Sequence, residues 1–386
     1  MRQLLRYLIL SAVVLFLAVF LIGPVYTVVE VGLDRELLCE VFSNYIYLEG
    51  MCNSFAIAAV TTLFVFLIAL PLALLYDRYE FPGKSWSNLL VMLPMILPPF
   101  VGALGFQQIL GHYGVINTLL AHCGIGPVDF LGGNGRFWSV CLIEALHLYP
   151  ILYLNLVTAL GNLDPALDEA ARNLGASRFR RFRQITLPLM KPGILAGGSL
   201  VLVWSFTELG TPLMFGYNRV TSVQIFNGIT ELETNPVPYA LVVVMLFFAA
   251  AMYVVGKLVL GRSELNTTVK GSAGSSARPL PGWKKYLPTL CFFALTLFAA
   301  LPHAALILTA FSLRWYGTIL PEHFSLLNFE NALSNKVVIP SIINSLYYSF
   351  LAMTAAVAVG VAVSLAAVRW KLRGSAVADL LSMLPL

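Results

Sequence analysis

Three ionisable side chains lie inside long apolar runs, where charged residues are rare. Glu144 and His147 fall within the run 138–160, and Glu208 falls within 194–216. Charged groups are costly in hydrocarbon, so such residues mark functional sites by default. Glu144 and His147 are three positions apart and share one face of a helix. With Glu208 they could line a path across a membrane, or all three could be protonated or hydrogen-bonded packing residues.

No familiar catalytic or cofactor motif accompanies these residues. Gly83-Lys84-Ser85 resembles the end of a P-loop, but Arg78 stands where that motif needs its first glycine. The sequence contains no HExxH and no GxSxG, and its five histidines and five cysteines show no ligand spacing. We therefore expect no catalytic residue, no metal site and no cofactor in this chain. Any ATP that drives the protein must then bind to a partner subunit.

The composition is that of a polytopic membrane protein. Hydrophobic residues make up 59% of the 386 residues and charged residues 11%, with a mean hydropathy of +0.82, whereas soluble domains are roughly 25% charged. About twenty apolar residues cross a bilayer as one helix. We predict an all-α fold with about eight complete transmembrane helices and the start of a ninth near residue 376. The eight predicted spans cover 7–28, 53–76, 88–111, 138–160, 194–216, 239–260, 286–311 and 344–368. Three prolines, Pro94, Pro98 and Pro99, could break the third span or only kink it.

The positive charges set the predicted orientation. Cytoplasmic segments of membrane proteins carry an excess of Lys and Arg. With the N-terminus inside, the inner segments hold 19 of the 24 Lys and Arg residues, and the net charge of +5 lies in loops and gives no indication of nucleic acid. The first apolar run is too long for a cleaved signal peptide and lacks its small-residue site, so we expect it to remain as a span.

An internal repeat divides the chain. Residues 53–95 begin NSFAIAAVTTLFVF and end NLLVMLPM, and residues 344–386 begin NSLYYSFLAMTAAV and end DLLSMLPL, at a constant offset of 291. The stretch between the copies is rich in Gly, Ser and Pro, as flexible linkers are. We predict a first domain over 1–262, a cytoplasmic linker over 263–285 and an incomplete second domain over 286–386. We also expect this chain to be a truncated form of a longer, two-domain protein.

The most polar part of the chain is LDEAARNLGASRFRRFRQITLP, residues 167–188, which holds seven charged residues. Asp164 can cap a helix that starts at the following proline, and Gly175 can end that helix as a C′ glycine. Ser177 can cap a second short helix. We therefore predict a helix–glycine–helix on the cytoplasmic surface, within the loop 161–193. Attachment to anionic lipid would explain the arginines, but it would not explain the order of the other residues.

That order resembles the EAA loop of ABC-transporter permeases of the binding-protein-dependent import type. The matching residues are Glu169, Ala170, Ala171, Gly175, Ile185, Leu187 and Pro188. The resemblance implies a type I importer permease fold in the bacterial inner membrane, with no enzymatic activity of its own. It also implies two partners besides the lipid bilayer, which are cytoplasmic ABC ATPase subunits, expected as a dimer, and a periplasmic substrate-binding protein.

The resemblance also implies roles for single residues. The loop would be the coupling helix, which docks into a cleft on the ATPase. Ala170 and Ala171 would let it seat closely, Glu169 would meet a polar or basic group, and Gly175 would set the bend. Phe179 and Phe182 would tie the loop back to the spans.

A second resemblance concerns the cargo. Paired domains in one chain, and the segment FTELGTPLMFGYNRVTSVQIFNGI at 206–229, resemble the iron(III)-type importer permeases. Polyamine, thiamine, phosphonate, sulfate and molybdate importers share the same loop and remain alternatives. An ion-coupled secondary transporter would also use repeats and broken helices. Against it, both copies of the repeat start on the same side of the membrane, and an EAA loop has no function in such a carrier.

Overall fold

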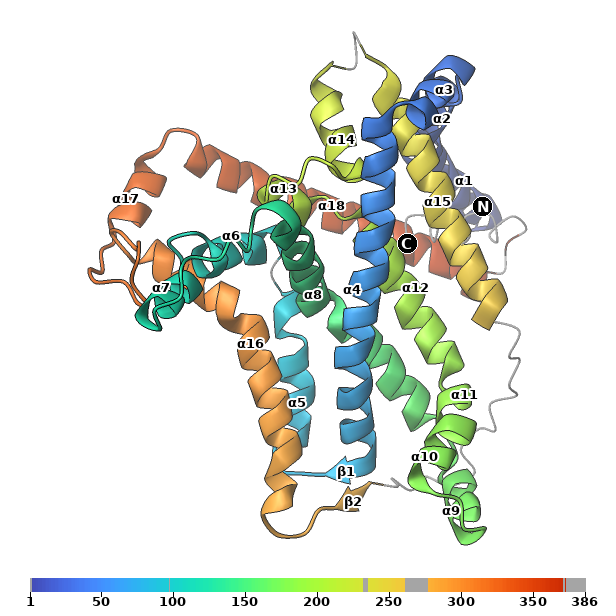
Figure 1. Ribbon diagram of the computed structural model, residues 1–386. Coiled ribbons are helices and arrows are strands. Elements are labelled where there is room, and N and C mark those ends of the chain that lie inside the picture. The colour runs from blue at the N-terminus through green and yellow to red at the C-terminus, as the bar shows by residue number, and fades with distance from the viewer. Residues whose placement is uncertain (1, 97, 232–234, 261–276, 371, 373–386) are drawn as a thin grey trace.

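The protein is a helical bundle in which seven helices of the described part are long and apolar enough to cross a membrane. The computed structural model describes residues 2–96, 98–231, 235–260, 277–370 and 372. The α-helices, shown in Figure 1, are α1 (Arg2–Leu17), α2 (Gly23–Gly32), α3 (Arg35–Ser43), α4 (Tyr45–Arg78), α5 (Lys84–Val91), α6 (Pro99–Leu110), α7 (Val115–His122), α8 (Gly133–Gly161), α9 (Pro165–Asn173), α10 (Arg178–Arg181), α11 (Leu187–Leu189), α12 (Lys191–Thr207), α13 (Gly210–Met214), α14 (Thr221–Gly228), α15 (Val237–Leu260), α16 (Tyr286–Ala310), α17 (Leu327–Ser334) and α18 (Val338–Ser364). The two short strands are β1 (Tyr79–Glu80) and β2 (Arg278–Pro279).

The core is built around α8, which packs against α4 and α12. Its aromatic and aliphatic side chains Tyr149, Leu152, Tyr153 and Leu156 are almost fully buried. A helix that is apolar on all sides belongs in a bilayer or in the centre of a bundle, and α8 occupies the central place. The predicted all-α membrane fold is therefore confirmed.

The expected third span is a broken helix. The sequence predicted one span over 88–111, but α5 and the helical segment that begins at Pro99 are bent by 88° relative to each other. A proline has no backbone N–H to continue a helix, and Pro98 and Pro99 occupy the N-cap and first position of α6. Counting this bent pair as one span gives eight among the described residues. The predicted ninth span, near residue 376, lies outside the described residues.

Two further boundaries differ from the prediction. The second span begins at Tyr45 rather than at residue 53, because Asn44 accepts a hydrogen bond from the Ile46 backbone N–H and starts the helix there. The fifth span, expected over 194–216, is interrupted at Glu208, where the backbone becomes extended between α12 and α13. Each difference arises from a polar side chain that satisfies free backbone groups at a helix end.

The helix that follows the predicted linker packs into the same core as the helices before it. Phe292 and Ala299 of α16 belong to the main buried cluster, and α16 lies along α5 and α6. The Pro302 backbone lies so close to Gly105 of α6 that a Cβ at position 105 would overlap its carbonyl group. Most of the predicted linker over 263–285 falls at residues 261–276, outside the described residues.

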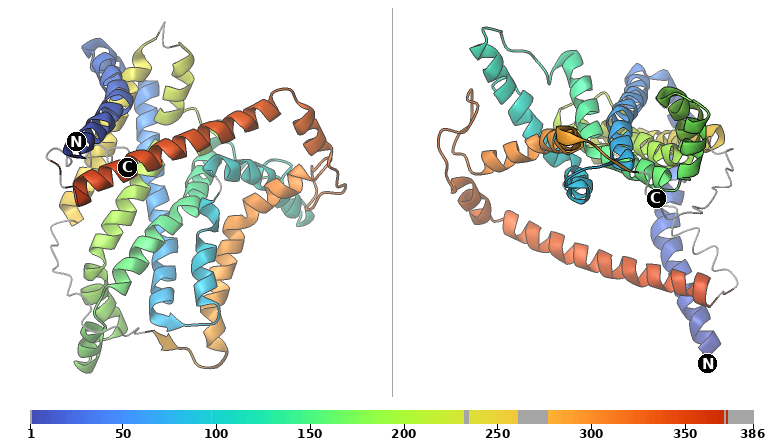
Figure 2. Two further views of the ribbon diagram at one scale, coloured as in Figure 1. Left: turned by 180° about the vertical axis from the view of Figure 1, so that it is seen from behind. Right: turned by 90° about the horizontal axis from the view of Figure 1, so that it is seen from below.

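Helix α18 lies beside the bundle rather than inside it. Figure 2 shows it crossing the other helices obliquely and meeting α1 near its C-terminal end. There Val363 and Ala366 pack against Leu10, Val13 and Leu17. The rest of α18 is exposed, although the repeat makes it the counterpart of the well-buried α4. By length and composition α18 is nevertheless one of the seven candidate spans.

We predict that Gly105→Ala destabilises the protein, because the new methyl group would push α6 away from the Pro302 backbone. Overpacking of this kind costs about 1–3 kcal/mol. The matched control is Gly102→Ala in the same helix, where a Cβ would meet no atom within 4 Å. Thermal unfolding of the purified protein should show a lower midpoint for the first variant alone. Equal midpoints for both would contradict the close packing of α6 on α16.

Candidate functional site

The charged segment 167–188 forms a helix–turn–helix at one end of the bundle. Figure 1 shows α9 and α10 at the same end as β1 and β2, and α14 at the opposite end. The Asp164 side chain accepts a hydrogen bond of 2.9 Å from the Ala166 backbone N–H, and Pro165 is the first residue of α9. The predicted start of this helix is confirmed.

Gly175 ends α9 in the way the sequence predicted. Its φ angle is +80°, in the left-handed region that side chains disfavour. The Gly175 N–H donates to the Arg172 carbonyl at 2.9 Å, and the Ala176 N–H donates to the Ala171 carbonyl at 3.0 Å. This pair of hydrogen bonds is a Schellman motif, which satisfies carbonyl groups that would otherwise be free at the helix end.

An ion pair that the sequence did not reveal fixes the angle between the two helices. Arg181 of α10 reaches back to Asp168 of α9, with 2.6 Å between Nη1 and Oδ2. The arginine side chain is only 12% exposed, whereas the aspartate is 45% exposed. Ser177 also accepts a hydrogen bond of 3.3 Å from the Arg180 N–H, which confirms it as the cap of α10.

The second helix is shorter than its residues suggested. α10 has four residues and continues as a π-helical turn over Phe182–Thr186. Pro188 lies in the next short helix, α11. Phe179 is 71% exposed and makes no tie to the spans, while Phe182 is half-buried.

The residues of the EAA resemblance divide into an exposed group and a supporting group. Glu169, Ala170 and Gly175 are exposed, and Ala171 is partly exposed. Ile185, Leu187 and Pro188 are half-buried in the helical turns that lead into α12. The apolar Leu174 beside the exposed group is 88% exposed. An exposed helix face that combines leucine, alanine and a carboxylate is suited to contact another protein.

Glu144 and His147 contact different neighbours although they are three residues apart. Glu144 is 1% exposed, and its Oε2 accepts hydrogen bonds from Ser205 Oγ of α12 and, at 3.4 Å, from Thr61 Oγ1 of α4. His147 Nδ1 donates to the Pro94 carbonyl at 2.9 Å, at the break between α5 and α6. In this structure Glu144 therefore joins three helices, and His147 supports the broken span.

Glu208 lies at a helix break rather than within a helix. Its Oε1 accepts hydrogen bonds from the backbone N–H groups of Gly210 at 3.0 Å and Thr211 at 3.3 Å, so it caps α13. Its own carbonyl accepts a hydrogen bond of 2.6 Å from Ser222 Oγ of α14. Glu208 thereby fixes both short helices that follow it.

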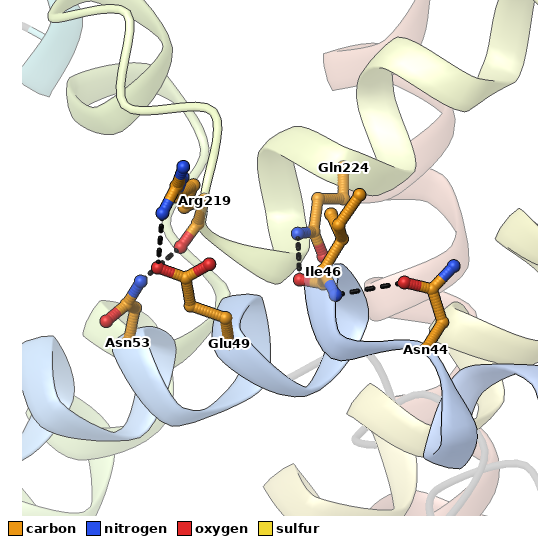
Figure 3. Close-up of polar contacts among 6 residues, drawn as sticks. All are labelled: Asn44, Ile46, Glu49, Asn53, Arg219 and Gln224. Carbon is orange, nitrogen blue, oxygen red and sulfur yellow. Dashed lines mark hydrogen bonds and ion pairs between the residues drawn. The ribbon is translucent and has the colours of Figure 1, made fainter.

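A set of polar contacts holds α14 against the start of α4, and Figure 3 shows its members. Arg219 forms an ion pair of 2.8 Å with Glu49, and its carbonyl accepts a hydrogen bond of 2.8 Å from Asn53 Nδ2. Gln224 Nε2 donates to the Ile46 carbonyl at 2.8 Å. The sequence singled out Asn53 in the repeat and 206–229 as a segment, but gave no sign that they touch. Among the described residues, no group of three or more His, Cys, Asp or Glu could hold a metal ion.

Comparison with known proteins identifies the family. Residues 68–264, just over half of the chain, match the family described as "Binding-protein-dependent transport system inner membrane component". The chain belongs to this family. The matched range includes all of α8 to α12, and with them the helix–glycine–helix that carries the EAA resemblance.

Relatives cover the chain to different extents. A putative ferric transport system permease protein of Haemophilus influenzae is 25% identical over 385 residues, which is 98% of this chain and 59% of that protein. A probable molybdenum ABC transporter permease protein of Haloferax volcanii is 32% identical, over 55% of this chain. Permease proteins of sulfate and spermidine/putrescine transport systems also match. The chain thus spans little more than half the length of its ferric relative.

A solved structure shares the fold. A chain of a bacterial alginate ABC transporter, in complex with an alginate pentasaccharide-bound periplasmic protein, superposes with a TM-score of 0.54. The superposition covers 70% of this chain and 97% of that chain, at 21% sequence identity. The expected fold, that of an ABC importer permease, is therefore confirmed.

We predict that Gly175→Ala loosens the turn between α9 and α10. No atom lies within 4 Å of a Cβ there, so the cost is that of a left-handed backbone alone, about 1–2 kcal/mol. Trypsin should then cut the arginine-rich loop roughly ten times faster, in proportion to the opened population. Gly124→Ala is the matched control, with φ +76° and equally open space, in the turn after α7. Equal cleavage of the loop in both variants would contradict a role of Gly175 in holding it.

Proposed function

We propose that this chain is the permease component of an ATP-driven importer of the bacterial inner membrane, passing a solute from a periplasmic binding protein to the cytoplasm. The observation that carries the proposal is the exposed face of α9 with Glu169 and Ala170, held at a fixed angle by Gly175 and by the ion pair between Asp168 and Arg181. Membership of the family supports it. A secondary carrier would have no use for such a face.

The proposed mechanism transmits movement of the loop directly to the core helices. Cytoplasmic ATPase subunits, acting as a dimer, would dock on α9, where Ala170 and Ala171 allow a close approach and Glu169 meets a basic or polar group. The loop joins α8 to α12, and these two helices share the buried contact between Glu144 and Ser205. A rigid-body shift of α9 on ATP binding would therefore move both helices together, which is how a ligand biases two arrangements of a packed protein.

The proposed orientation places the N-terminus and the helix–glycine–helix in the cytoplasm. It rests on the 19 of 24 Lys and Arg residues in the inner segments. The repeat further supports a second permease domain that begins at α16, after a linker within 263–285. In that arrangement the first domain would supply one docking site for an ATPase subunit.

Iron(III) is the proposed cargo. The ferric relative aligns over 98% of this chain, through the segment that follows the linker, whereas the molybdenum relative aligns over 55% of it. Molybdate, sulfate and polyamines are the alternative cargoes, because permeases named for them are also relatives.

Uptake of labelled iron(III) by iron-starved cells tests the coupling role and the cargo together. Glu169→Lys should lower uptake on the order of tenfold or more while the protein stays in the membrane, because a charged contact at the docking face would be reversed. Glu40→Lys is the matched control, since Glu40 is an exposed acid on α3, at the other end of the bundle.

The outcomes separate the two parts of the proposal. If unaltered cells take up no iron, the cargo is wrong, and the same assay with molybdate, sulfate and spermidine identifies the right one. If uptake is normal in Glu169→Lys, the helix–glycine–helix has no part in coupling.

We also propose that Glu144, His147 and Glu208 lie along the translocation path, and Glu208→Gln tests this. The glutamine keeps the oxygen that caps α13 and removes the negative charge. If the path uses that charge for a cationic cargo, uptake should fall about tenfold with an unchanged unfolding midpoint. Normal uptake at normal protein levels would show that Glu208 serves only to cap the helix.

A further inference from the structure

The end of the bundle that carries α9 also contains a cleft of about 210 Å³. It lies between α9 and α10 on one side and the end of α4 on the other, and β2 contributes to its wall. Its charged lining residues are Asp77, Arg78, Asp164, Asp168, Glu169, Arg178, Arg181 and Arg278.

The guanidinium groups of three of these arginines have no partner among the described residues. The side chains of Arg78, Arg178 and Arg278 form no hydrogen bond and no ion pair with any residue in the part of the chain that the structure describes. Most of the acids are already engaged: Asp168 pairs with Arg181, Asp164 caps α9, and Asp77 has an interaction of its own. Glu169 is exposed. The lining holds four arginines and four acids, and among the described residues three of the guanidinium groups and the Glu169 carboxylate have no partner.

The lining of the cleft also includes apolar side chains. Leu160 and Leu163 come from the end of α8, and Ile185 and Leu189 come from the turn before α12. Leu160 is buried and the other three are half-buried. A ligand that fills this cleft would thus meet both charged side chains and hydrocarbon.

Aromatic side chains place the cleft at the level of a membrane surface. Trp86 lies in the first turn of α5, shortly after β1, and Trp283 lies shortly after β2; their side chains are 71% and 73% exposed. Tryptophan and tyrosine gather at the interface between hydrocarbon and headgroups, and Tyr79 itself lines the cleft. In the proposed orientation this interface is the cytoplasmic leaflet, which carries anionic lipids.

Arg278 reaches the cleft through the pairing of the two strands. Tyr79 and Glu80 pair in parallel with Arg278 and Pro279, so the segment after the linker is fastened to the end of α4. The cleft thereby gathers one free arginine from each of three places: α4, α10 and β2.

We propose that this cleft binds the phosphate group of an anionic phospholipid of the inner leaflet. Guanidinium groups recognise phosphate with charge-assisted hydrogen bonds, and basic pockets at the cytoplasmic ends of membrane helices suit such headgroups. The acyl chains would lie along the apolar side chains of the lining. The proposal uses the orientation given under the proposed function, but it does not depend on the cargo or on the ATPase.

Binding of fluorescent phosphatidylglycerol to the purified chain in detergent tests the proposal. Phosphatidylcholine and inorganic phosphate are the comparison probes. The double variant Arg178→Gln/Arg278→Gln should bind phosphatidylglycerol about 25-fold more weakly, since each surface arginine contributes about fivefold. The matched control is Arg183→Gln/Lys284→Gln, which removes one exposed charge from the same loop and one from the segment after β2, both outside the cleft. It should bind within about twofold of the unaltered chain, because neither side chain lines the cleft.

A third variant distinguishes loss of the charge from misfolding. Arg178→Lys/Arg278→Lys keeps the charge and should retain most of the affinity, with an unchanged unfolding midpoint. Equal affinity for phosphatidylglycerol and phosphatidylcholine would overturn the proposal, as would equal affinity of the glutamine double variant and its control. Saturation by inorganic phosphate at the same concentrations, without any preference for the lipid, would identify a free-phosphate site and overturn the lipid assignment. None of these outcomes bears on transport, so failure here is distinct from failure of the proposed function.

Discussion

In hydrocarbon there is no water to satisfy a free backbone N–H or carbonyl, so a helix can break inside a membrane only where the protein supplies partners. This constraint governs both breaks in the bundle. At the bend between α5 and α6, His147 donates to the carbonyl of Pro94. At the break after α12, the Glu208 carboxylate accepts from two backbone N–H groups, and Ser222 donates to the Glu208 carbonyl. His147 and Glu208, two of the costly polar groups of the spans, thus satisfy backbone groups where the helices are irregular.

The same constraint explains where the charge of the protein is placed. Within the core, Glu144 accepts hydrogen bonds from Ser205 and Thr61. The arginine-rich helix–glycine–helix lies at the end of the bundle, where the backbone can also reach water. There the order of residues sets a rigid shape through a cap, a left-handed glycine and one partly buried ion pair. A rigid projection on two core helices is what an external subunit needs in order to move them.

Most of the correct predictions came from short-range features of the sequence. The apolar runs gave the spans, and Asp164, Gly175 and Ser177 gave the ends of α9 and the start of α10, because caps depend on a few neighbouring residues. The sequence left open whether the third span is broken or only kinked, since a proline pair permits either and only packing decides between them. It also placed Glu208 inside a helix. The pairs of Arg181 with Asp168 and of Arg219 with Glu49 could not be found at all, because they join segments whose proximity depends on the tertiary fold.

The parallel pairing of Tyr79 with Arg278 has a consequence for biogenesis. Residue 79 is synthesised long before residue 278. The strand β1 at the end of α4 therefore has no pairing partner while α5 to α15 are inserted. In the same way, the surface of α6 around Gly105 stays uncovered until Pro302 of α16 has been synthesised. Both contacts close only when the segment after the linker returns to the side of the membrane where β1 lies. The first half of the chain is therefore completed by residues synthesised after it, and an error in the topology of α16 would leave both surfaces uncovered.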